Sequence, residues 1–79
     1  MSHWKPHGHE RLSPFMHQFI NAATSAGYVM NSKDRYTLEF TRPDPYKFFL
    51  LKKNAIESAN DLQKALESHK IPAPKPAGH

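Results

Sequence analysis

The sequence predicts an α+β domain in which a helix, a three-stranded antiparallel meander and a second helix follow one another (αβββα), with both helices on one face of the sheet. Apolar residues recur at helical spacing in two stretches, alternate with polar residues between them, and a proline-containing turn divides the alternating part. The 79 residues allow one domain, and a core this small contributes only about 3–5 kcal/mol. We expect residues 13–71 to form that domain, between a flexible histidine-rich arm at 1–12 and a disordered proline-rich tail at 72–79.

The first helix is expected to begin at Ser13 and Pro14. A serine side chain caps free amide groups, and proline is tolerated at the first helical position. Gly27 follows Ala26 where a left-handed cap is expected, so it should end the helix. The apolar stripe that should face the sheet consists of Phe15, Met16, Phe19, Ile20 and Ala23. A short apolar run at 28–31 then predicts the first strand.

The second strand is predicted over residues 35–41, where apolar and polar side chains alternate. One face of this strand should be buried and the other exposed to solvent. The side chains expected in the core are Tyr36, Leu38 and Phe40. Residues 42–45 contain two prolines, which lack the amide donor of a strand ladder, so we expect this segment to form the tip of a hairpin.

The third strand, predicted over residues 46–52, differs from the second because it holds four consecutive apolar residues. Such a run places apolar side chains on both faces of a sheet. If the helices cover one face only, we expect Phe49 and Leu51 to point outward between Lys47 and Lys53. This expected patch is the first functional hypothesis.

The second helix is expected to begin at Ser58, with Asp61 in its first turn as a variant of the capping box. Its buried stripe should consist of Leu62, Ala65 and Leu66. Ile71 should fold back onto the core as an apolar stop before the prolines of the tail.

In architecture, residues 19–71 resemble the HicA toxin family and the double-stranded-RNA-binding domain, both built as helix, three strands, helix. The shared features are a helix closed by Ala26, Gly27 and Tyr28 and a late helix that follows a strand. In the toxin family, a glycine-serine-histidine signature near the second strand supplies the catalytic histidine. This chain has NSKDR at 31–35 instead, so the resemblance implies no RNase activity. The RNA-binding domain has a lysine cluster at the start of its last helix, whereas the paired lysines here lie several residues earlier. The resemblance is one of architecture, which does not transfer function.

Composition excludes several classes of site. The chain has no cysteine, hence no disulfide or thiolate metal site, which fits a reducing compartment such as the cytoplasm. No apolar run approaches the roughly 20 residues of a membrane span, and no signal-peptide pattern is present. The sequence also lacks a G-x-S-x-G elbow and a phosphate-binding glycine loop. We therefore predict a non-catalytic cytoplasmic protein with no cofactor and no membrane partner.

Histidines are the one feature that could indicate a metal. His3, His7 and His9 lie in the predicted arm, and His17 on the first helix could add a nitrogen ligand. A flexible arm loses conformational entropy for each ligand it orders, and no closed zinc pattern is present. We favour solvated histidines and predict no metal site.

Two hypotheses of function remain, and both use the hairpin, because residues 33–53 contain six basic and three acidic residues. The leading one is a small regulatory or inhibitory protein, of the kind phages and other mobile elements encode. It would dock through a basic, aromatic hairpin face onto a larger protein, such as a nucleic-acid-handling enzyme, or onto a second copy. The residues predicted to bind the partner are Arg35, Arg42, Tyr46, Lys47, Phe49, Leu51, Lys52 and Lys53.

The alternative is a module that binds RNA or single-stranded DNA directly. Lysines and arginines of the hairpin would contact phosphates while Phe49 or Tyr46 stacks on an unpaired base. The whole chain has only three arginines, the side chain best suited to bidentate phosphate contacts. Protein docking is therefore favoured.

Overall fold

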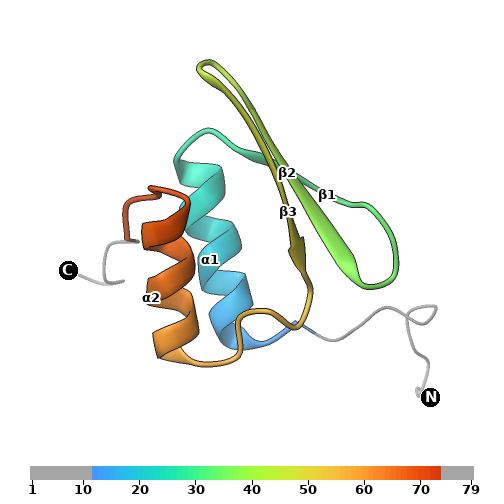
Figure 1. Cartoon of the computed structure of the whole chain (residues 1–79), viewed down its shortest axis with the longest axis vertical. Coiled ribbons are helices and arrows are strands. Elements are labelled where there is room, and N and C mark those ends of the chain that lie inside the picture. The colour runs from blue at the N-terminus through green and yellow to red at the C-terminus, as the bar shows by residue number, and fades with distance from the viewer. Residues whose placement is uncertain (1–11, 74–79) are drawn as a thin grey trace.

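The computed structural model describes residues 12–73, which form a sheet layer and a helix layer (Figure 1). The elements, in chain order, are α1 (Pro14–Ser25), β1 (Val29–Ser32), β2 (Thr37–Pro43), β3 (Tyr46–Lys52) and α2 (Ala59–Ser68). The strands are antiparallel, in the order β1-β2-β3. Both helices lie on the same side of the sheet, and the β2–β3 hairpin extends beyond them. The predicted αβββα architecture is confirmed.

The capping residues predicted for α1 occupy their expected positions. The Met16 amide donates to the Ser13 hydroxyl at 3.0 Å, and Pro14 opens the helix. The Ser13 hydroxyl also donates to the carbonyl of Ile56, which ties the start of α1 to the loop before α2. At the other end, Gly27 has a φ of 100°, a backbone conformation that residues with a Cβ rarely adopt. The helix therefore begins and ends where its local sequence requires.

The second helix is capped in the same way. The Asp61 amide donates to the Ser58 hydroxyl at 3.1 Å, and the Asp61 carboxylate accepts from the Glu57 amide at 3.2 Å. After the helix, the Ile71 amide donates to the carbonyl of Leu66 at 2.8 Å, and the Ile71 side chain is buried. The predicted return of Ile71 onto the core is confirmed.

The hairpin is tighter than expected, because Arg42 and Pro43 belong to β2 and the turn consists of Asp44 and Pro45. Pro43 pairs with Tyr46 at the end of the ladder. The missing amide of Pro43 costs no ladder bond. An amide at this position would point toward β1, but the β1–β2 ladder ends at Thr41, so no carbonyl of β1 lacks a donor because of Pro43.

The core lies between the helices and the inner face of the sheet. Its largest fully buried side chains are Met16, Phe19, Phe40 and Ile56. Phe19 and Phe40 meet edge to face, with ring centroids 5.5 Å apart. Leu12, the last residue of the predicted arm, packs against this core. The rest of the arm, and the tail beyond Ala73, lie outside the described residues.

Two predictions of side-chain orientation are wrong. Phe49 and Leu51 do not point outward: they pair with Phe40 and Leu38 across the hairpin and pack against the core. Directly opposed residues of antiparallel strands share a face, so the buried side of β2 fixes the buried side of β3. Tyr36 was expected in the core but is 50% exposed, because it precedes β2 in the loop from β1.

The two adjacent phenylalanines of β3 provide a direct test of this orientation. Phe49→Ala should lower the free energy of unfolding by about 3 kcal/mol, since it leaves a cavity in the core. Phe48→Ala, its matched control on the other face, should cost less than about 1 kcal/mol. Urea denaturation measures both changes. Equal losses, or a larger loss for Phe48→Ala, would contradict the register.

Candidate functional site

The face of the sheet opposite the helices is the candidate functional site. No described helix packs on it (Figure 1). Strand alternation and register assign its side chains, because neighbours along a strand point to opposite faces. We call this surface the uncovered face, and its residues are Val29, Asn31, Thr37, Glu39, Thr41, Pro43, Tyr46, Phe48, Leu50 and Lys52.

Large apolar side chains dominate the uncovered face. Tyr46 is 69% exposed, Val29 57%, Phe48 45% and Leu50 44%. Thr41 pairs with Val29 on one side and with Phe48 on the other, so these three residues form one row across the sheet. Leu50 lies two residues along β3 from Phe48 on the same face. The exposed apolar side chains thus gather along β3 and at Val29, at the far end of the row through Thr41.

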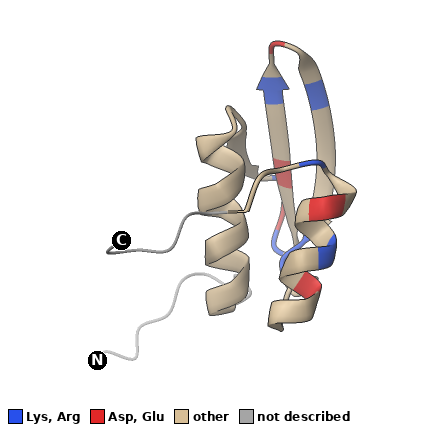
Figure 2. Ribbon diagram, turned by 90° about the vertical axis from the view of Figure 1, so that its left-hand side faces the viewer, with Lys and Arg blue, Asp and Glu red and all other residues tan. Residues whose placement is uncertain are grey.

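The charges of the uncovered face balance. Its charged side chains are Glu39, in the row that pairs with Leu50, and Lys52, at the end of β3. Figure 2 shows the basic residues of the sheet near the ends of its strands rather than in the middle. The surface is therefore rich in apolar side chains and close to neutral, and not basic as predicted from the sequence.

The basic residues at the hairpin tip lie on the helix side. Arg42 is half-buried, with its guanidinium 4.9 Å from the centre of the Tyr28 ring, and its Nε donates to the carbonyl of Pro45 at 3.1 Å. Lys47 pairs with Arg42 and therefore shares its face. Lys47 also acts electrostatically on His69, at the end of α2. These two predicted partner-binding residues are thus separated from the uncovered face.

Lys53 is buried, with 4% of its surface exposed. Its Nζ donates to the Ser32 hydroxyl at 3.0 Å, and its amide donates to the carbonyl of Tyr36 at 2.8 Å. The side chain fastens the end of β3 to β1. The expectation that Lys53 lies on the rim of a binding surface is therefore wrong.

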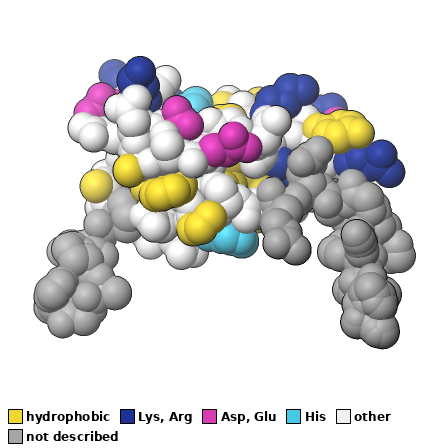
Figure 3. Space-filling view, turned by 90° about the horizontal axis from the view of Figure 1, so that it is seen from below, with side chains coloured by type: hydrophobic (Ala, Val, Ile, Leu, Met, Phe, Trp, Pro, Cys, Tyr) yellow, Lys and Arg dark blue, Asp and Glu magenta, His cyan; other side chains and the backbone are white. Residues whose placement is uncertain are grey.

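The β1–β2 loop brings basic side chains to one end of the uncovered face. The Asp34 carboxylate accepts from the Tyr36 amide at 2.8 Å, and this bond lowers the pKa of Asp34. The Arg35 guanidinium lies 5.8 Å from the centre of the Tyr36 ring. Basic and hydrophobic side chains adjoin at the sheet end of the molecule (right of Figure 3). A shallow hollow of about 240 Å³ lies nearby and is lined by Lys33, Thr37, Leu50, Leu51 and Lys52.

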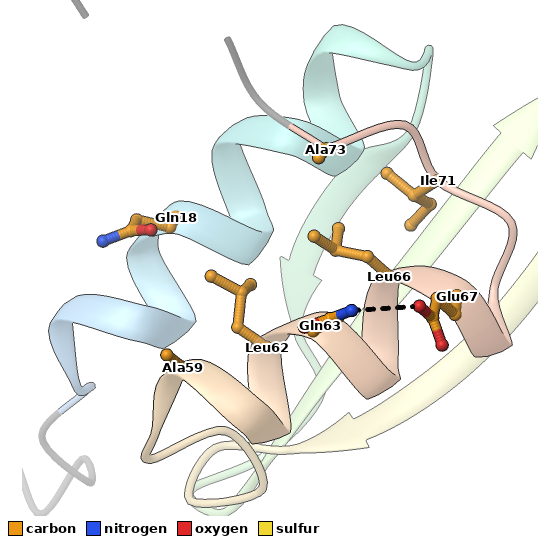
Figure 4. Close-up of a pocket in the computed structure, with 8 residues that line it drawn as sticks. All are labelled: Gln18, Ala59, Leu62, Gln63, Leu66, Glu67, Ile71 and Ala73. Atoms are coloured by element: carbon orange, nitrogen blue, oxygen red, sulfur yellow. Dashed lines mark hydrogen bonds between the residues drawn. The ribbon is translucent and has the colours of Figure 1, made fainter. Parts of the chain in front are cut away.

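A second hollow, a groove of about 440 Å³, lies between the helices (Figure 4). Leu62, Leu66 and Ile71 give it apolar walls, and Gln63 donates to Glu67 at 3.3 Å on its rim. The remaining lining residues are Gln18, Ala59 and Ala73. Among its described lining residues, the groove contains no pair of acid and base groups that could carry out a reaction. Within residues 12–73, no group of three histidine or acidic side chains could hold a metal ion.

Among the predicted partner-binding residues, the uncovered face holds Tyr46 and Lys52, and Arg35 lies at its end. Sequence reasoning missed Val29, Phe48 and Leu50, which the structure places there. A two-residue turn at 44–45 would have paired Phe40 with Phe49 and so identified the opposite face of β3.

The chain matches no protein-family model, and comparisons with curated proteins and with solved structures find no significant match. The resemblance to the toxin and RNA-binding families thus stays a statement about the order of elements. None of the helices in residues 12–73 has the length and apolar character needed to cross a membrane.

His69 makes stability depend on pH. Its ring stacks on Phe49 with centroids 3.8 Å apart, and burial, with a smaller effect of Lys47, lowers the pKa of His69 below its usual 6.5. The folded state therefore prefers the neutral ring. Its contribution should be complete above about pH 6.5 and decline as the pH falls through the lowered pKa.

We expect His69→Phe, which keeps an aromatic ring but cannot titrate, to lose less stability than the wild type between about pH 7 and pH 5. His17→Gln, on the exposed side of α1, is the control for loss of a histidine. Urea denaturation at both pH values measures the difference. An identical pH dependence in wild type and His69→Phe would contradict the prediction.

Proposed function

We propose that this chain is a small non-catalytic regulatory or inhibitory protein that binds another protein through the uncovered face. The observation that carries the proposal is the exposure of Tyr46, Phe48 and Leu50 together on a surface that no described helix covers. Monomeric proteins seldom expose contiguous apolar surface without a use for it.

The composition of the face suits a protein interface. Aromatic side chains such as Tyr46 and Phe48 supply much of the binding energy at interfaces, because they bury large areas with few rotatable bonds. Burial of apolar surface contributes roughly 25 cal/mol per Å² before the costs of association. Lys33, Arg35 and Lys52 lie at one end, where charges can orient an approaching partner. The partner should therefore present an apolar patch with acidic groups on one side.

Direct nucleic-acid binding is the second candidate, because the exposed rings of Tyr46 and Phe48 could stack on unpaired bases. Three observations favour protein docking over it. Glu39 lies in the middle strand of the face and would repel phosphates, and Lys53 is buried. Arg42 is stacked on Tyr28 on the other side of the sheet. Of the six basic residues within 33–53, these two are therefore poorly placed to neutralise a phosphate backbone.

A pair of double variants tests the proposal. Phe48→Ser with Leu50→Ser should abolish capture of a protein in a pull-down from native lysate, because it removes the apolar centre. The matched control, Lys47→Ser with Lys52→Ser, changes the same strand and should retain most of the captured protein. Circular dichroism should show that both variants are folded.

Fluorescence anisotropy with single- and double-stranded oligonucleotides separates the two candidates. Micromolar binding near physiological salt would support the nucleic-acid alternative, with affinity falling by about 0.7–0.9 log units per log unit of salt for each neutralised phosphate. The docking proposal would be contradicted if, in addition, Lys47→Ser with Lys52→Ser lost oligonucleotide binding and Phe48→Ser with Leu50→Ser kept it.

A further inference from the structure

We propose that the outer edge of β3 pairs with β3 of a second copy of this chain, antiparallel, to form a six-stranded sheet. β3 is an edge strand seven residues long, whereas β1, at the other edge, has four. An edge strand of this length presents a row of backbone donors and acceptors that favours pairing with another strand. The proposal concerns the edge of the strand, whereas the proposed function concerns its face.

The backbone groups available at this edge follow from the ladder inside the sheet. The Lys53 amide donates to the Tyr36 carbonyl at 2.8 Å, so Lys53 directs its amide toward β2. Every second residue of an antiparallel strand does the same, so Leu51 and Phe49 also exchange hydrogen bonds with β2. Antiparallel ladders alternate, so the residues between these point their amides and carbonyls away from β2. The outward groups belong to Tyr46, Phe48, Leu50 and Lys52.

In one antiparallel register, the outward backbone groups of one copy pair with the outward backbone groups of the other. With Phe49 opposite Phe49 of the second copy on the two-fold axis, Phe48 lies opposite Leu50 and Tyr46 opposite Lys52. Each of these pairs consists of two residues whose backbone groups point outward, so all four outward positions find partners. The helices of both copies stay on the same side of the sheet, because opposed residues share a face.

The charges of β3 agree with this register. Lys47 lies opposite Leu51 of the second copy, and Lys52 lies opposite a tyrosine ring, which attracts a cation. A shift that sets Leu50 opposite its own copy would place Lys47 opposite Lys53 instead. A parallel arrangement in register would place each lysine beside its own copy, which is destabilising. Self-complementarity of the strand therefore favours a second copy as the occupant.

Pairing would also enlarge the uncovered face. Phe48 and Leu50 of each copy would meet across the two-fold axis and form one apolar strip over two sheets. Only this consequence rests on the proposed function, because the doubled surface would then be the one that binds the partner.

Sedimentation velocity of the full chain, at protein concentrations from about 1 µM to 1 mM, detects a dimer whose dissociation constant lies in the micromolar to millimolar range. We expect the wild type to change from monomer to dimer across this range. Leu50→Pro removes an outward amide and no bond to β2, and should raise the dissociation constant at least tenfold. Leu50→Ala, the matched control, loses the same side chain but keeps the amide and should still dimerise. A wild type that stays monomeric, or Leu50→Pro that dimerises like Leu50→Ala, would overturn the proposal.

Cross-linking gives a second readout if Leu50→Pro fails to fold. The chain has no cysteine. The Cα atoms of a hydrogen-bonded antiparallel pair lie about 5.5 Å apart, within disulfide range. An oxidised mixture of Phe48→Cys and Leu50→Cys chains should form a mixed disulfide dimer several-fold faster than either chain alone. Equal rates would count against the register.

The two proposals can fail separately. A monomeric wild type that still captures a protein through Phe48 would overturn the pairing of edges and leave the proposed function standing. A dimer that dissociates in Leu50→Pro but captures nothing would support the pairing and count against the proposed function.

Discussion

The contact between Phe40 and Phe49 across the hairpin determines most of this structure. Their rings are stacked, with centroids 4.9 Å apart and an angle of 13° between the ring planes. Phe19, Tyr28 and His69 surround the Phe49 ring, so α1, the segment after it and the end of α2 all converge on β3. Once Phe49 belongs to the core, strand alternation places Phe48 on the opposite face.

The described part of the chain, residues 12–73, has helices on one face of its sheet only. Its two helices occupy one side, and the consecutive apolar residues of β3 then leave Phe48 and Leu50 exposed on the other. An isolated folded domain gains nothing from these exposed side chains, and the exposed edge of β3 is an added risk of unwanted association. A surface that binds a partner accounts for both features, because the partner removes the apolar groups from water.

Local chemistry made the elements predictable from sequence. Ser13, Gly27 and Ser58 mark helix ends by hydrogen bonding and by backbone freedom, which do not depend on distant residues. The orientation of β3 was not predictable by inspection of β3 alone, because four consecutive apolar residues have no period of two. Its orientation depends on the pairing with β2, and hence on the length of the turn. The burial of Lys53 likewise depends on Ser32 and Tyr36, which lie far from it in sequence.

The division of β3 between core and uncovered face is the central claim, and the accessibility of its two phenylalanine rings tests it most directly. A soluble paramagnetic agent broadens NMR signals of protons near the surface. We expect strong broadening for the ring protons of Phe48, which is 45% exposed, and weak broadening for those of Phe49, which packs against the core. The reverse order would show that β3 is turned over, and would contradict both the site and the function proposed for it.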